Sequence, residues 1–161
     1  MHLALARPLR TRPVTIAQVR AYTAKAREFA EAAASDLGAG RNIAATSLAI
    51  HAGISAADAI CGARLGVRAA GEDHDQVLAL LGQAGPDGAE VARDLRRLLP
   101  LKTRAEYEPD DIAGSTAAKA VERAQRCVAV AQRVANRTTS RPLIVPGERF
   151  ELSRSVSSRG V

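Results

Sequence analysis

Aromatic side chains are scarce in this 161-residue sequence, which has two Phe, two Tyr and no Trp. Sheets favour aromatic and β-branched residues, whereas closely packed helices accept small ones such as the alanines that are abundant here. No segment fits a strand better than the helix it would replace. We therefore predict an all-α protein, and its length fits one domain whose core needs neither metal nor disulfide.

Cysteines and metal-ligand patterns are also few. Cys61 and Cys127 fall on apolar faces of predicted helices, with no Cys or His at ligand spacing, so we interpret them as small core residues. No glycine fingerprint follows a strand, which argues against a nucleotide-cofactor enzyme. No short helix carries the polar and basic cluster of a DNA-recognition helix. We therefore expect no metal and no cofactor.

Long apolar runs are missing as well. The longest uncharged run, residues 42–57, contains His51 and is too short and too mixed for a membrane span. The apolar stretch at residues 3–6 is too short for the core of a signal peptide. These absences predict a cytoplasmic protein that does not enter a membrane.

The net charge of +6 is concentrated at the two ends of the chain. Residues 15–136 contain 15 basic and 15 acidic side chains, which cancel. The remaining 8 basic residues stand against only 2 acidic ones, and this difference is the whole net charge. Basic arms can attract nucleic acid without reading its sequence, but solvated basic tails are also common without a function.

Helical periodicity divides the chain into five predicted helices. They cover residues 16–37, 41–70, 72–81, 91–99 and 112–136, and a short connector spans 101–109. Thr15 is expected to cap the first helix, and Gly38 and Gly40 to end it. The second helix is rich in alanine and glycine, which predicts the most buried position. We expect a flexible basic arm at 1–14, a helical bundle at 15–137 and a disordered basic tail at 138–161.

Three polar residues share one face of the predicted central helix. At about 100° per residue, Ser47, His51 and Asp58 fall within a narrow arc beside an apolar stripe. An imidazole near a carboxylate could act as a general base in a groove. The alternative is a hydrogen-bonded polar cluster in the core or in a dimer interface.

Arg68 and His74 form a second candidate pair across the helix break at Gly71. An arginine can hold a phosphate while a nearby histidine moves a proton, which suits metal-independent cleavage of RNA at its 2′-hydroxyl. A histidine near a helix start is also a common surface residue, so both interpretations stay open.

The most distinctive stretch is Lys102 to Pro109, just before the last helix. Lys102 and Arg104 could contact phosphates, and Tyr107 could stack on a base. Alternatively, Tyr107 closes the bundle and Arg104 pairs with a nearby acid. These residues, together with Asp58, are candidates for binding RNA or a protein partner.

The order of these segments resembles the HEPN superfamily, the small helical domains named after higher eukaryotes and prokaryotes nucleotide-binding proteins. The resemblance spans about residues 16–135 and rests on four segments: residues 42–57, residues 72–74, the Arg104-Ala105-Glu106-Tyr107 segment, and the alanine-rich last helix. It is closest to stand-alone bacterial members. It implies an up-and-down bundle of four to five helices, usually a homodimer, often found with nucleotidyltransferase partners in toxin–antitoxin and defence systems.

Many HEPN relatives are metal-independent ribonucleases with an Arg, four to six residues and a His, set in a cleft between two subunits. Arg68 and His74 satisfy that spacing, although no His follows Arg104. The first interpretation is therefore a dimeric RNA-binding or RNA-cleaving domain, in which Arg68 or Arg104 holds phosphate and His74 or His51 is the base. The second is a non-catalytic homodimeric module that binds a nucleotidyltransferase-type partner.

Overall fold

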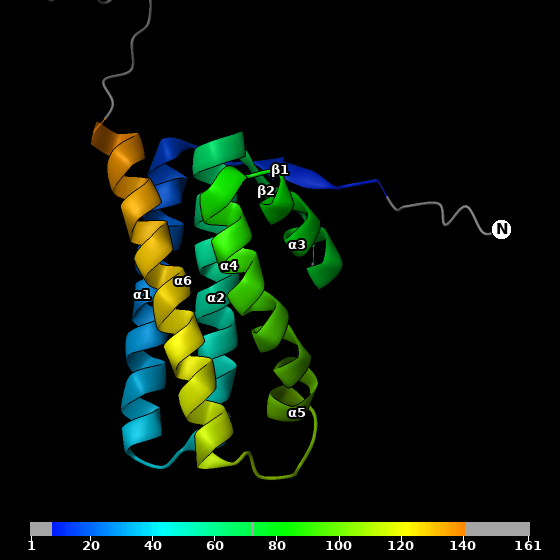
Figure 1. The fold of residues 1–161 in the computed structure, drawn as a ribbon, viewed down its shortest axis with the longest axis vertical. Helices are drawn as coiled ribbons and strands as arrows, with labels where there is room; N and C mark the ends of the chain where they lie inside the picture. Colours follow the sequence, from blue (N-terminus) through cyan, green and yellow to red (C-terminus); the bar gives the residue numbers. More distant parts are fainter. Residues whose placement is uncertain (1–7, 72, 141–161) are drawn as a thin grey trace, which may run out of the picture.

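The computed structural model describes residues 8–71 and 73–140 and shows a bundle of helices (Figure 1). The predicted all-α class is confirmed. Residues 1–7 of the expected basic arm and residues 141–161 of the expected tail lie outside the described residues.

The first helix, α1 (Ile16–Gly38), begins where the sequence predicts. The Thr15 side chain accepts a hydrogen bond from the backbone of Gln18, and the Gln18 side chain accepts one from the backbone of Thr15. This reciprocal pair satisfies two amides that the helix cannot bond internally. The helix ends before Gly40, whose φ is 75°.

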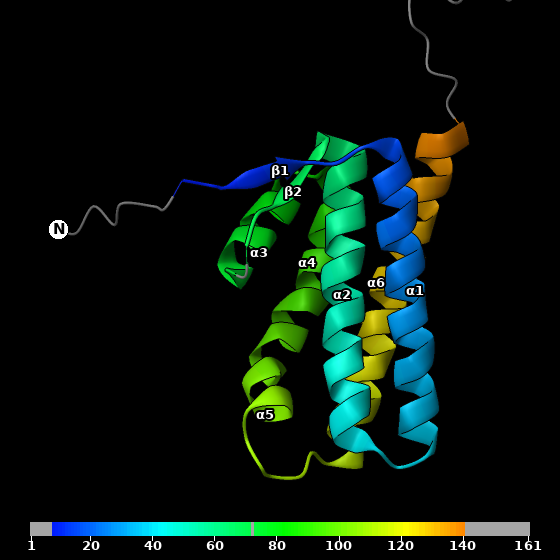
Figure 2. The same cartoon turned by 180° about the vertical axis from the view of Figure 1, so that it is seen from behind.

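Helix α2 (Asn42–Leu65) is the central element, and it packs against α1, α4 and α6 (Figures 1 and 2). Its buried residues are mostly small, which lets the neighbouring backbones approach closely. One is Gly53, where an added Cβ would lie 2.9 Å from Leu98 Cδ1. By length and hydropathy α2 also qualifies as a membrane span, but 61% of its most apolar window is buried in the bundle. Its burial is that of a core helix in a soluble protein.

The central helix is shorter than predicted. It ends at Leu65, whereas the predicted end is Ala70. Gly66 adopts a left-handed conformation with φ of 72°, which is a common helix end and one that glycine adopts without steric cost. The following residues form strand β2 (Val67–Ala69).

The prediction that the chain has no strand is therefore wrong. Strand β1 (Thr11–Pro13) pairs antiparallel with β2, with Arg12 opposite Arg68. Backbone bonds extend the pairing, from Val14 N to Gly66 O at 2.9 Å and from Ala70 N to Arg10 O at 2.7 Å. Part of the expected flexible arm is thus an ordered element laid across one end of the bundle (Figure 2).

Four further helices complete the bundle: α3 (His74–Gly82), α4 (Gly85–Leu98), the short α5 (Lys102–Glu106) and α6 (Gly114–Ser140), with a 3-10 turn, η1 (Leu99–Leu101), between α4 and α5. Several boundaries differ from prediction. Helix α4 begins at Gly85, before the predicted start at residue 91, and Pro86 lies in its first turn, a position that suits proline. The connector contains α5, and α6 continues past Asn136 to Ser140.

The two cysteines are buried, as predicted. Burial raises the pKa of both thiols to about 12, so neither is a ready nucleophile.

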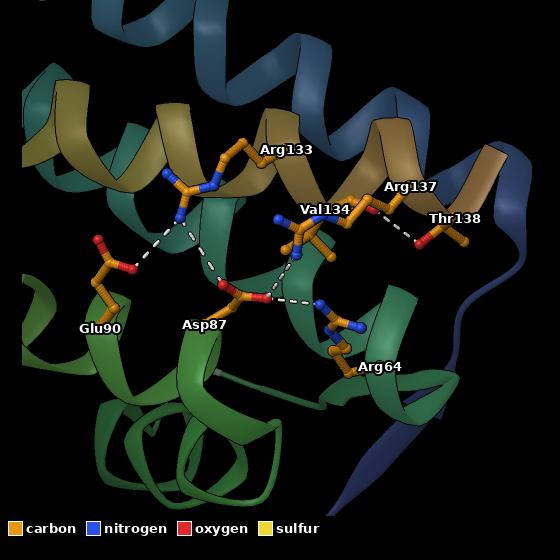
Figure 3. A network of polar contacts seen from close by, with 7 residues as sticks. All are labelled: Arg64, Asp87, Glu90, Arg133, Val134, Arg137 and Thr138. Atoms are coloured by element: carbon orange, nitrogen blue, oxygen red, sulfur yellow. Dashed lines mark hydrogen bonds and ion pairs between the residues drawn. The ribbon is translucent and has the colours of Figure 1, made fainter. Parts of the chain in front are cut away.

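One carboxylate ties three helices together at the end of the bundle where α2 finishes (Figure 3). Asp87 in the first turn of α4 lies 2.6 Å from Arg64 of α2, 3.8 Å from Arg133 and 3.9 Å from Arg137 of α6. Arg133 also lies 3.4 Å from Glu90. Acidic residues at a helix start and basic residues at helix ends are the favourable arrangement for the helix dipoles.

Candidate functional site

The short helix α5 contacts one histidine on each of two other helices. The Glu106 Oε1 atom lies 3.3 Å from Nε2 of His51 on α2, and the Lys102 Nζ atom lies 3.2 Å from Nε2 of His74 on α3. Lys102 and Glu106 are four residues apart and so project from the same face of α5. We call His51, His74, Lys102 and Glu106 the α5 cluster.

His51 sits at the surface with an aromatic neighbour. Its side chain is 42% exposed and its ring centroid lies 5.5 Å from that of Phe29 on α1, with the planes tilted by 34°. The Glu106 side chain is 20% exposed. The imidazole therefore contacts a carboxylate and an aromatic ring and stays open to solvent, so His51 does not belong to a polar cluster in the core of the subunit.

The neighbours of the two imidazoles differ in what they can exchange. A carboxylate accepts hydrogen bonds, so a proton on His51 Nε2 can form a hydrogen bond to Glu106. An ammonium has three donors and no acceptor, so the His74 nitrogen facing Lys102 must present its lone pair. In this arrangement His51 Nε2 is a hydrogen-bond donor and His74 Nε2 is an acceptor.

His74 is the first residue of α3, directly after the N-cap Asp73, whose side chain accepts a hydrogen bond from Asp75 N at 3.1 Å. The cap fixes where the helix begins. The position of His74 in the bundle is therefore set by the start of α3.

Arg68 and Asp58 belong to a different group of side chains. The Arg68 guanidinium lies 5.8 Å from the Tyr22 ring and donates a 3.0 Å hydrogen bond to the carbonyl of Ala69. Burial raises the pKa of Asp58 to about 6, while the positive charges of Arg68 and Lys25 act in the opposite direction. The contacts described for Arg68 therefore differ from those described for His74, its predicted partner.

The other predicted residues lie outside the α5 cluster. Tyr107 is 76% exposed and does not close the bundle. Arg104 is exposed, and no ion pair found among residues 8–71 and 73–140 includes it. Ser47 lines a hollow where the starts of α2 and α6 meet, and the lining of this hollow does not include His51.

Glu106 is the member of the α5 cluster that sequence reasoning missed. It stood within the distinctive segment, but its partner His51 is 55 positions earlier in the chain, and no local pattern links them. Phe29 and Tyr22 were likewise unassigned, because their contacts with His51 and Arg68 depend on how α1 packs.

The chemistry available to the α5 cluster is proton transfer and electrostatic stabilisation. Two imidazoles and an ammonium are the groups that move protons to and from oxygen and stabilise phosphate charge. In the part of the chain that the structure describes, no group of three or more His, Cys, Asp or Glu residues is placed to hold a metal ion.

No protein-family model matches the chain, and no curated protein matches it either. What the cluster can do is therefore inferred from its own residues.

Proposed function

We propose that this protein is a cytoplasmic HEPN-like domain that binds RNA at the α5 cluster and cleaves it without a metal. The observation that carries the proposal is that two histidines contact residues on one face of α5, each with a partner of different hydrogen-bonding character. In a dimer of the kind that the HEPN resemblance implies, such a protein would serve as the toxin or effector of a toxin–antitoxin or defence system.

The roles follow from the partners. RNA binding draws the Lys102 ammonium from His74 Nε2 to a phosphoryl oxygen, and the freed lone pair of Nε2 takes the proton from the RNA 2′-hydroxyl. The 2′-oxygen then forms a bond to phosphorus while the bond from phosphorus to the 5′-oxygen breaks. His51, oriented by the hydrogen bond from its Nε2 to Glu106, gives the proton on its other ring nitrogen, Nδ1, to the departing 5′-oxygen. Lys102 stabilises the negative charge that gathers on the phosphoryl oxygens.

The first experiment measures cleavage of a single-stranded RNA by the purified protein in chelator. We expect cleavage by the wild type and a loss of about 10²- to 10⁴-fold in His51→Ala and in His74→Ala, the usual range for a general acid or base. The products should end in a 2′,3′-cyclic phosphate. Arg104→Ala, on the other face of α5, should weaken binding more than it slows the chemical step.

A second substrate separates the acid from the base. If sulfur replaces the 5′-bridging oxygen, the leaving group needs no proton, so His51→Ala should regain most of its rate while His74→Ala should not. Rescue of His74→Ala alone would reverse the two roles. Equal losses on both substrates would contradict the assignment of either residue as acid.

The alternative is a non-catalytic homodimeric module that binds a nucleotidyltransferase-type protein. The observation favouring it is that Arg68, the expected phosphate-holding residue, already contacts Tyr22 and its own strand. Folded wild-type protein that leaves both RNA substrates intact would favour this alternative.

A further inference from the structure

A furrow between α4 and α6 is lined entirely by charged residues. It has a volume of about 590 Å³, and its lining consists of Glu90, Arg93, Asp94, Arg97, Arg123 and Arg126. Four of these six side chains are arginines, so the lining carries an excess of positive charge. No aromatic or aliphatic side chain lines it, which distinguishes it from the apolar anchor pockets at the centres of protein interfaces.

Both acids of the furrow are already paired, one with an arginine of the furrow itself and one with an arginine outside it. Asp94 accepts two hydrogen bonds from Arg126, at 2.8 and 3.1 Å, and Glu90 lies 3.4 Å from Arg133. The Asp94 side chain is only 16% exposed, so the Asp94–Arg126 pair packs against the bundle. The carboxylates therefore leave the remaining arginines of the furrow unopposed.

Arg93, Arg97 and Arg123 are the arginines that remain. No ion pair found between residues of the described ranges, 8–71 and 73–140, includes any of the three. Arg93 and Arg97 are exposed and Arg123 is half-buried. Arg93 and Arg97 are one helical turn apart and so lie on the same face of α4, about 6 Å from each other along the axis.

We infer that the α4–α6 furrow binds the phosphate backbone of single-stranded RNA. Guanidinium forks match phosphate oxygens in pairs, and a row of them along a helix can follow successive phosphates without reading bases. Helix α4 runs beside α6 and leads through η1 to α5, so the helix that forms one side of the furrow continues into the helix that carries Lys102 and Glu106 (Figure 1). The inference rests on the proposed action on RNA. It adds that the furrow holds the part of the RNA strand that lies beyond the cleavage site.

The test measures binding of a fluorescent 2′-O-methyl RNA, which has no free 2′-hydroxyl and cannot be cleaved. Binding is compared between wild type, the double variant Arg93→Gln/Arg97→Gln, and the control Arg20→Gln/Arg27→Gln. The control removes the same charge from exposed positions of α1. We expect a marked loss of affinity only in the α4 variant. A plot of the logarithm of the binding constant against the logarithm of the salt concentration should be less steep by about 1.4 for this variant, because each of the two lost phosphate contacts contributes about 0.7. Arg123→Gln should change the slope in the same direction by half as much.

Each outcome bears on the inference separately from catalysis. Wild type that binds this RNA but cleaves no natural RNA would overturn the proposed nuclease and leave the furrow standing. Equal weakening by the α4 and α1 variants would mean that only net charge matters, and would overturn the furrow. If poly-glutamate displaced the fluorescent RNA as well as unlabelled RNA of equal charge does, the furrow would not recognise phosphate. That result would favour an acidic protein partner.

Discussion

At the scale of single residues, Asp58 is a carboxylate whose environment opposes its charge. It sits on α2 beside Arg68 and Lys25, and burial nevertheless raises its pKa from 3.8 to about 6. The loss of water around the carboxylate thus outweighs the attraction of two cations.

This shift predicts a pH dependence of stability. Because the folded-state pKa is raised, the folded protein binds this proton more tightly than the unfolded chain does. The stabilisation is fully present below pH 3.8 and is lost as the pH rises to about 6. The free energy of unfolding of Asp58→Asn should therefore exceed that of wild type by about 1 to 2 kcal/mol at pH 7, when screening by solvent is taken into account. The two should be equal below about pH 4. Urea denaturation between pH 3.5 and pH 7 measures the difference.

The matched control is Asp110→Asn, an exposed carboxylate in the loop before α6. Its effect should stay within about 0.5 kcal/mol throughout. A constant offset between Asp58→Asn and wild type across the pH range would contradict the assignment to Asp58.

At the scale of helices, the close contact of α3 and α4 depends on a glycine. A Cβ on Gly88, in the first turn of α4, would strike the backbone carbonyl oxygen of Leu81 and lie 2.8 Å from the Cβ of Ala84. Backbone cannot move aside as a side-chain end can, so the two helices would have to separate.

Gly88→Ala should therefore lower the free energy of unfolding by about 1 to 3 kcal/mol, the usual effect of overpacking. Gly82→Ala is the control, because nothing lies within 4 Å of a Cβ there and alanine is the better helix former. Thermal and urea unfolding should show Gly82→Ala at or slightly above wild type. If both variants matched wild type, the helices would be more loosely packed than described here.

Helices were predictable from sequence where their signals are local. Thr15 and Gln18 are three residues apart, so the start of α1 could be read directly. Strands β1 and β2 have three residues each, too few for a period, and each is stabilised by a partner 54 to 58 positions away. The end of α2 at Gly66 was missed for the same reason, since β2 forms only when β1 lies beside it. The α5 cluster was found in part: His51, His74 and Lys102 were candidates, whereas Glu106 required the packing of α5 on α2.

At the scale of the whole molecule, Asp87 connects the ends of α2, α4 and α6 (Figure 3). Its side chain is 16% exposed, whereas the arginines around it are 38% to 64% exposed. A partly buried carboxylate shared by three cations differs from a solvated surface pair, which contributes little.

Asp87→Asn should lower stability by about 1 kcal/mol at low salt, and by less in 1 M salt, because the network is screened. Glu31→Gln is the comparison, since the Arg27–Glu31 pair is 3.9 Å long with both side chains more than half exposed, and its loss should be close to neutral. Chemical denaturation at two ionic strengths measures both. Equal effects of the two variants would contradict a special role for Asp87.

The pairing of β1 with β2 sets the limit of the autonomous folding unit. Arg10 accepts a hydrogen bond from Ala70 and donates one to Gln76 at the start of α3, so the bundle is joined to the chain five residues before α1 is capped. A fragment excised at Thr15 would leave β2 as an unpaired edge and remove Val14 from its place between α1 and α6. The smallest fragment that keeps every described element intact therefore begins at or before Arg10, although helical periodicity alone would place its start at α1.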